Sequence, residues 1–190
     1  MILHKTFALS SKINKEDDFI NLHVVRSILL IAKLIRKHGG RWKPLKSTWQ
    51  LYERIQQGDN TAATELYQIL FKTYATEYNW AYISGNESDC AFYQFSIGYS
   101  LYMLHHLGAE WRHYRDYQAL FEQAFPEQVD PLSGFSNVNF PSQYILHFWF
   151  DFAWQVGLIE KRESTDENTN GFSKEIIATP LFTELISWHI

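Results

Sequence analysis

Cysteine is almost absent from this sequence, which has Cys90 alone among its 190 residues. A single cysteine excludes an intrachain disulfide and a cluster of thiolate metal ligands within one chain. This usage is typical of a reducing compartment, so we expect a cytoplasmic protein. The amino terminus also lacks the basic region, apolar run and small-residue cleavage site of a secretory signal.

Long hydrophobic runs are missing as well. The two candidate segments, residues 24–35 and 144–159, are interrupted by charged or polar side chains. Both are shorter than the roughly 20 apolar residues that cross a bilayer as a helix. We therefore interpret them as core helices and expect no membrane association.

Recognisable catalytic motifs are absent too. The sequence has no Gly-x-Ser-x-Gly motif, no P-loop, no Gly-x-Gly-x-x-Gly after a strand and no His-Glu-x-x-His. Cys90 follows Glu87 and Asp89, whose charges oppose a thiolate, so we interpret it as a buried, unreactive residue. The expectation is a protein that is not an enzyme and needs no cofactor.

Positive charge is not in excess either. The chain has 17 Lys and Arg against 21 Asp and Glu, a net charge of −4. Nucleic-acid-binding proteins usually carry an obvious basic excess, which this composition does not show. A local basic patch remains compatible with these numbers.

Aromatic residues, by contrast, are plentiful: 14 Phe, 11 Tyr and 7 Trp. Rings at helical spacing in residues 89–125 could line a ligand pocket or stack on bases, but such spacing favours a packed core. Apolar periodicity and the positions of Gly and Pro predict a mainly helical protein. The expected helices cover about residues 19–38, 45–57, 61–82, 89–107, 109–125, 141–156 and 180–188, with short hairpins near 39–44 and 158–178.

The order of elements near each end is typical of a winged helix. From residue 141 onward, a helix, a glycine, a strand, a polar loop, a strand and a helix follow one another, and in that fold the first of these helices would enter a DNA groove. Residues 34–51 repeat this order with almost no wing, if Gly39-Gly40 ends the first helix. We expect a first winged-helix-like unit at 1–58, a helical middle at 59–126, a connector at 127–139 and a second unit at 140–190, with one compact domain overall as the alternative.

Five distinctive motifs are spread over most of the chain: Glu16-Asp-Asp-Phe, Glu77-Tyr-Asn-Trp-Ala-Tyr, Phe95-Ser-Ile-Gly-Tyr-Ser-Leu-Tyr-Met-Leu, Leu107-Gly-Ala-Glu-Trp-Arg and Thr179-Pro-Leu-Phe. Together they resemble a bacterial family of winged-helix-like proteins to which no activity is assigned. The resemblance implies a bacterial origin and a winged-helix-like fold, and it identifies no catalytic residue.

One histidine cluster has the composition of a metal site. His106, Glu110 and His113 would share a face of one continuous helix, with His105 adjacent. The spacing is similar to that of carboxylate-bridged di-iron bundles, but those need a second such motif, which is missing. Gly108 is also expected to break the helix between His106 and Glu110, so we expect solvated histidines and no stoichiometric metal.

A basic segment is the most informative local feature. Between residues 26 and 46 no acidic residue occurs, although the whole chain is acidic. This segment is either a solvated face or a surface that contacts phosphates. On a helix reaching His38, Arg26, Lys33 and Lys37 would form one stripe. The candidate phosphate-contacting residues are Arg26, Lys33, Lys37, Arg41, Lys43 and Lys46.

Three functional hypotheses remain open from the sequence. The first is a nucleic-acid-binding or regulatory protein that uses this basic segment. The second is a protein-interaction or scaffold module without DNA binding. The second wing is better suited to it, because its acidic residues outnumber its basic ones: Glu160, Glu163, Asp166, Glu167 and Glu175 against Lys161, Arg162 and Lys174. An enzyme with an unrecognised site is the third. Neither a specific partner nor an oligomeric state can be predicted.

Overall fold

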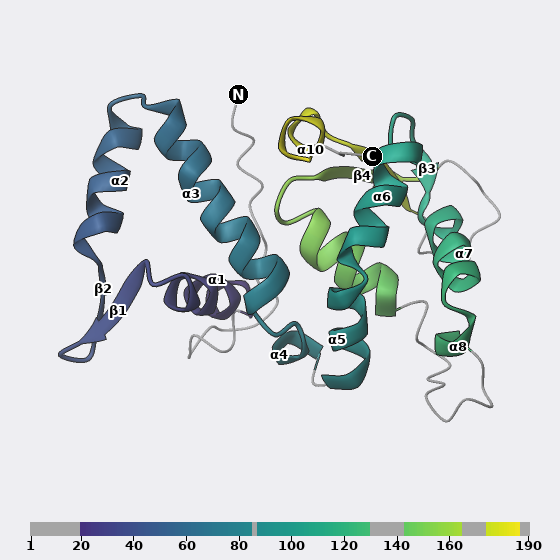
Figure 1. Ribbon diagram of the computed structural model, residues 1–190, viewed down its shortest axis with the longest axis horizontal. Coiled ribbons are helices and arrows are strands. Elements are labelled where there is room, and N and C mark those ends of the chain that lie inside the picture. The colour runs from purple at the N-terminus through teal and green to yellow at the C-terminus, as the bar shows by residue number, and fades with distance from the viewer. Residues whose placement is uncertain (1–19, 85–86, 130–142, 165–173, 187–190) are drawn as a thin grey trace. The chain divides into compact units, whose positions relative to one another are not determined.

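The computed structural model describes residues 20–84, 87–129, 143–164 and 174–186 of the chain. These residues are mainly helical, with one small antiparallel sheet toward each end (Figure 1), which confirms the expected fold class. The chain divides into two compact units, Met1–Thr73 and Tyr74–Ile190. Several predicted features lie outside the described residues: Pro141, Trp188, most of the second wing, most of the connector after 129, and the Glu16-Asp-Asp-Phe motif.

The first unit consists of helices around a two-stranded hairpin. Its α2 matches the helix expected at 45–57 within one residue at each end. Asp59 caps α3, since its carboxylate accepts hydrogen bonds from the amides of Thr61 and Ala62. The elements are α1 (Ile20–Ile31), β1 (Ile35–His38), β2 (Arg41–Pro44), α2 (Lys46–Gln56) and α3 (Asn60–Lys72).

The expectation that the first helix reaches His38 is wrong. Lys33 adopts a left-handed backbone conformation with φ of 55°. The amide of Leu34 donates to the Leu29 carbonyl at 2.9 Å and that of Lys33 to the Leu30 carbonyl at 3.0 Å, which is a Schellman end to the helix. The apolar pair Leu34-Ile35 continues the pattern of a buried helix, and a short apolar run does not distinguish helix from strand.

Gly39 and Gly40 therefore form a hairpin turn and do not end a helix. Both have positive φ, 58° and 73°. Two successive residues of this kind make the tight turn whose twist suits two-residue hairpins. The register pairs Ile35 with Pro44 and His38 with Arg41.

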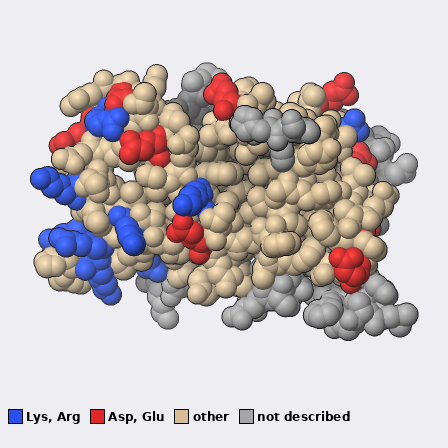
Figure 2. Space-filling model, viewed as in Figure 1, with Lys and Arg blue, Asp and Glu red and all other residues tan. Residues whose placement is uncertain are grey.

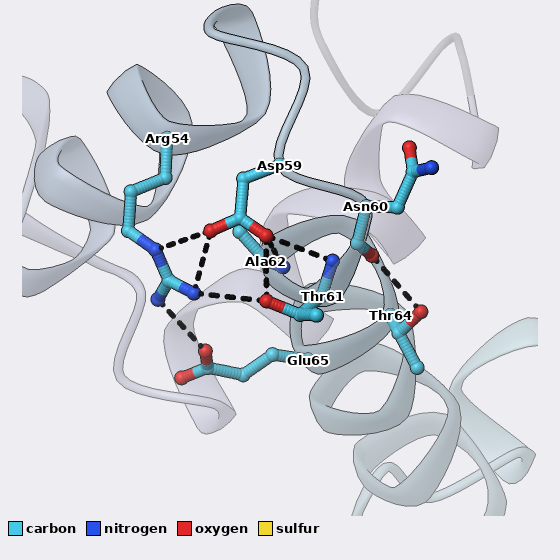
Figure 3. A network of polar contacts seen from close by, with 7 residues as sticks. All are labelled: Arg54, Asp59, Asn60, Thr61, Ala62, Thr64 and Glu65. Carbon is cyan, nitrogen blue, oxygen red and sulfur yellow. Dashed lines mark hydrogen bonds and ion pairs between the residues drawn. The ribbon is translucent and has the colours of Figure 1, made fainter.

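A polar network fixes the turn between α2 and α3 (Figure 3). The Arg54 guanidinium lies 2.8 Å from the Asp59 carboxylate and 3.2 Å from that of Glu65. The Thr61 hydroxyl, the Ala62 amide and Arg54 lower the pKa of Asp59 to about 2. Asp59 thus stays ionised in its capping role at neutral pH.

The second unit contains the larger sheet and an aromatic core. Its strands follow the order β3-β5-β4, all antiparallel, so residues expected in a helical middle contribute a strand to the second winged-helix-like unit. The expected helix at 109–125 begins only at Tyr114, after β3, and the helix at 89–107 is interrupted at Ser96. The elements are η2 (Thr73–Glu77, which begins at the unit boundary), α4 (Ala81–Ser84), α5 (Glu87–Phe95), α6 (Ile97–Leu107), β3 (Arg112–His113), α7 (Tyr114–Ala124), α8 (Pro126–Val129), η4 (Ile145–Ala153), β4 (Ile159–Glu163), β5 (Lys174–Ala178) and α10 (Pro180–Leu185).

The aromatic residues of the second unit pack mainly as core. Tyr144 stacks on Phe121 with ring centroids 3.7 Å apart, and its hydroxyl shares a 2.8 Å hydrogen bond with Ser100. The indole of Trp80 donates to the Tyr74 carbonyl at 2.9 Å. The largest fully buried side chains are Trp80, Trp149, Tyr78, Tyr93, Tyr117, Tyr144, Phe121, Phe148, Phe152, Leu104 and Leu158.

One backbone arrangement occurs in both units. In the second unit, Gly157 has φ of 80°, its amide donates to the Trp154 carbonyl, and the Leu158 amide donates to the Ala153 carbonyl at 2.8 Å. These bonds match those of Lys33 and Leu34 residue for residue. The exits match as well: the Leu45 amide donates to the Leu34 carbonyl, and the Thr179 amide to the Leu158 carbonyl. The weak sequence repeat therefore has a structural basis, with Lys33, and not Gly39, equivalent to Gly157.

Candidate nucleic-acid interface

The hairpin β1–β2 separates its side chains onto two faces. Residues directly opposite one another on antiparallel strands point to the same face, and successive residues alternate. The pairs Arg36–Lys43 and His38–Arg41 therefore share one face, which is entirely basic. The pair Lys37–Trp42 lies on the other face.

Every charged side chain of the hairpin is exposed to solvent. The two strands contain four Lys or Arg residues and no acidic residue. Among the described parts of the chain, no carboxylate forms an ion pair with any of these four. Figure 2 shows Lys and Arg side chains gathered over β1 and β2, at the lower left of the view.

The pair Arg36–Lys43 places like charges directly opposite each other. Such a pair destabilises a hairpin, whereas an opposite-charge pair contributes roughly 0.2–1 kcal/mol. The surface of this hairpin is thus unfavourable for its own folding. A polyanion bound to it would remove that repulsion.

Trp42 adds an aromatic ring to this basic surface. It is 41% exposed. The Arg26 guanidinium lies 5.5 Å and the Lys37 ammonium 5.6 Å from the centroid of its ring. Arg26 also contacts Nδ1 of His23 at 3.0 Å, so α1 fixes this side chain beside the hairpin.

The structure brings Arg26 and Lys37 together at Trp42 and places the other four predicted residues on the hairpin and the turns next to it, but not in the predicted way. The helical stripe of Arg26, Lys33 and Lys37 is wrong, because α1 ends at Ile31 and Lys37 lies on a strand. The residues belong instead to α1 (Arg26), its C-terminal turn (Lys33), β1 (Lys37), β2 (Arg41 and Lys43) and the first turn of α2 (Lys46).

The predicted site leaves out three members of this surface: Arg36, which the basic segment includes, and His38 and Trp42. The expected first helix contains Arg36 and His38, and Trp42 is expected in a short extended piece. The Gly39-Gly40 pair is the signal that could have found them, since two glycines between strand-forming segments favour a two-residue hairpin. The registered pairs then follow directly.

The second hairpin, β4–β5, shares the backbone frame of the first, that is, the Schellman turn before the hairpin and the hydrogen bond that closes it, but its surface is neutral. Its strands contain three basic and three acidic residues. Arg162 donates to the Glu175 carboxylate at 2.6 Å, and Lys174 pairs with Glu163. The Lys161 ammonium lies 3.3 Å from the centroid of the Trp154 ring. Four of its six charged side chains are thus paired with each other within the hairpin.

The helix before each hairpin is poorly suited to reading a DNA groove. In η4 seven of the nine residues are buried, so this helix is part of the core of its unit. In α1, Val24 and Ile28 are buried, and the exposed Leu22 and Val25 offer no hydrogen-bonding groups to base edges. A major groove also admits a two-stranded ribbon, which is the geometry of β1–β2.

The histidine cluster is divided between several elements. His105 and His106 lie in the last turn of α6, with ring centroids 5.0 Å apart. His113 caps α7, where its Nδ1 accepts from the Arg115 amide at 3.1 Å. Over the described ranges, no three His, Cys, Asp or Glu side chains are close enough to hold a metal ion. The side chain of Cys90 lies outside those ranges.

Two further findings concern the whole chain. Where the structure is described, no helix combines the length and apolarity that crossing a bilayer requires. Comparisons with protein-family models, curated proteins and solved structures returned no significant match.

Proposed function

We propose that this chain is a non-enzymatic nucleic-acid-binding protein that contacts phosphates through the cationic hairpin β1–β2. The proposal includes a regulatory role and a cytoplasmic location, in keeping with the single cysteine. The phosphate contacts come from the exposed side chains of Arg36, Lys37, Arg41 and Lys43, with Lys33 and Lys46 at the base of the hairpin and Arg26 beside it.

One observation carries the proposal: Arg36 and Lys43 face each other across the hairpin without an acidic partner among the described residues. The fold does not require this. In the second hairpin the equivalent pair is Glu160–Ile177, and the pair equivalent to His38–Arg41 is Arg162–Glu175, which forms an ion pair. Unpaired cations on a narrow ribbon suit a polyanion, whose binding releases condensed counterions.

The test is a fluorescence anisotropy titration of labelled oligonucleotides at low salt. Binding should be mainly electrostatic and should weaken steeply as salt is added. Replacing Lys37 and Arg41 by Ala should lower affinity for most sequences alike and reduce the salt slope by about one unit for each phosphate that is no longer bound.

The matched control is the double substitution of Lys161 and Arg162 by Ala. These residues occupy β4, at the positions equivalent to Lys37 and His38, and we expect them to matter much less. Absence of binding up to roughly tens of micromolar protein would refute the proposal, since non-specific binding has Kd of about 10⁻⁴–10⁻⁶ M.

A protein-interaction or scaffold module is the second candidate. Phe95 is 87% and Tyr102 is 44% exposed, and both lie on consecutive helices of the second unit. Exposed aromatic side chains are enriched in protein interfaces. If the anisotropy titration shows no binding, this candidate becomes the leading one.

A further inference from the structure

Resting on the proposed function, we infer that Trp42 stacks on an unpaired base, so that the cationic hairpin binds single-stranded nucleic acid in preference to duplex. The proposal starts from a difference between equivalent positions. In the shared frame, Trp42 on β2 corresponds to Ile176 on β5: Lys37 faces Trp42 and Lys161 faces Ile176.

Ile176 is a core residue, whereas Trp42 is a surface residue. Ile176 is completely buried, and its strand is flanked on both sides because β3 pairs with β5 through Arg112. The sheet of the first unit has only two strands among the described residues, and Trp42 remains 41% exposed. A large ring at the surface of a small hairpin leaves apolar area in water that a ligand could cover.

The ring of Trp42 keeps solvent-exposed area beside two cations. The Arg26 guanidinium and the Lys37 ammonium lie over it at cation–π distances, 5.5 and 5.6 Å from its centroid, and 41% of the residue's surface is exposed. In the second unit, the Lys161 ammonium lies 3.3 Å from the centroid of the Trp154 ring and covers that face. Trp154 is exposed to a similar degree, 39%.

An exposed aromatic ring among cations is the combination that binds single strands. The cations contact the backbone while bases stack on the ring, and the stacking tolerates any base sequence. In a duplex the base faces are already stacked on one another and only their edges reach the grooves. Trp42 would then contribute to binding of unpaired nucleotides and little to binding of a duplex.

The experiment compares an oligothymidylate of about 12 nucleotides with a duplex of the same length, at one low salt concentration. The proteins are the wild-type chain, Trp42→Leu and the control Trp154→Leu. We expect tighter binding of the single strand by the wild type. Trp42→Leu should weaken it between about 5-fold and about 100-fold, while duplex binding and the salt slope stay nearly unchanged. Trp154→Leu should leave both affinities unchanged.

Quenching of intrinsic fluorescence provides a second readout that is independent of the Leu variant's fold. The oligothymidylate should quench part of the tryptophan emission of the wild type, and Trp42→Phe should lose that quenching while keeping most of the affinity. Equal affinity for single strand and duplex, or equal loss of both in Trp42→Leu, would overturn the inference. Absence of all binding, or no effect of replacing Lys37 and Arg41, would instead overturn the proposed function.

Discussion

The hairpins β1–β2 and β4–β5 leave their preceding helices through the same Schellman turn and enter the following helices through the same hydrogen bond. Their surfaces differ. The first has four Lys or Arg residues and no acidic residue, while the second has three of each. The second is also extended by β3, whereas the described part of the first sheet stops at two strands.

The shared backbone frame requires some side chains and leaves others free to vary. Both hairpins keep a buried leucine, Leu34 or Leu158, immediately after the left-handed residue, so that position is structural. Most charged positions differ between them: Arg36, Arg41 and Lys43 correspond to Glu160, Glu175 and Ile177, whereas Lys37 and Lys161 are alike, so the shared backbone does not require the cations at those three positions. The cations at these positions, which have no acidic partner among the described residues, are what the proposed binding role would account for.

The largest expected difference between the units appears at alkaline pH. In the second unit, burial raises the pKa of Tyr117 to about 12 and those of Tyr74 and Tyr144 further above the usual value near 10. Folding thus favours the neutral phenols, and their contribution to stability is complete below pH 10 and is lost as the pH rises above it. In the first unit, Tyr67 is the described tyrosine with a comparable shift, to about 12.

We therefore expect the second unit, with β4–β5, to unfold first in an alkaline titration. Tyrosinate absorbance should rise together with the loss of near-ultraviolet circular dichroism, and amide exchange should locate the loss in the second unit. Tyrosines that all titrate near pH 10 while the circular dichroism is unchanged would contradict this.

A smaller change in stability is expected when Lys33 and Gly157, the equivalent residues with a left-handed backbone, are each replaced by the residue found at the other position. Gly157→Lys should destabilise the second unit by about 1–2 kcal/mol, because a left-handed conformation costs that much for a residue with a Cβ. The atom nearest to an added Cβ is Leu181 Cδ2 at 3.4 Å, so the cost arises from the backbone and not from a clash. Lys33→Gly should stabilise the first unit by less, since glycine also increases the entropy of the unfolded chain.

Urea unfolding of both single variants, followed by amide exchange, would measure these changes. If the two turns are equivalent, the two substitutions should change the free energy of unfolding in opposite directions. A destabilising Lys33→Gly would show that the two turns are not equivalent.

The smallest effect concerns the cross-strand pair of the first hairpin. Lys43→Glu replaces a like-charge pair with an attractive one opposite Arg36 and should stabilise the hairpin by about 0.2–1 kcal/mol. The same change should lower affinity for oligonucleotides. Urea midpoints and anisotropy titrations on one preparation would measure both quantities.

The matched control is Glu175→Lys, which puts a like charge opposite Arg162 in the second hairpin. It should destabilise that unit slightly and should not lower affinity. If Lys43→Glu left the affinity unchanged, the cationic face of the first hairpin would not be a binding surface.

The sequence predicted the helical class, most helices and the two hairpin regions, because apolar periodicity and Gly or Pro positions report on them directly. It did not predict that the first helix stops at Ile31. Lys33 carries the left-handed conformation that glycine carries at 157, and nothing in a lysine signals this. Gly39-Gly40 then looked like a helix end, although it is a hairpin turn.

Because the first helix was predicted to reach His38, the residues Arg26, Lys33 and Lys37 were wrongly predicted to form one helical stripe. The basic segment itself was found, since an acid-free stretch is visible in the sequence. The cross-strand pairs within the segment were not predicted. Which side chains share a face of a hairpin depends on the register, and the register depends on where the turn lies. Likewise, β3 could not be foreseen: two residues, Arg112 and His113, join a sheet through pairing with β5, far away in sequence.

The most direct test of the central claim, that only the first of the two hairpins binds nucleic acid, is an NMR titration of the unmodified chain. Uniformly ¹⁵N-labelled protein would be titrated with a short oligonucleotide at low salt, and amide and indole shifts would be followed. Our account predicts the largest shifts in Ile35–Pro44 and in the Trp42 indole, with β4 and β5 nearly unchanged. Shifts concentrated in Ile159–Glu163 and Lys174–Ala178, or an absence of shifts at saturating oligonucleotide, would contradict it.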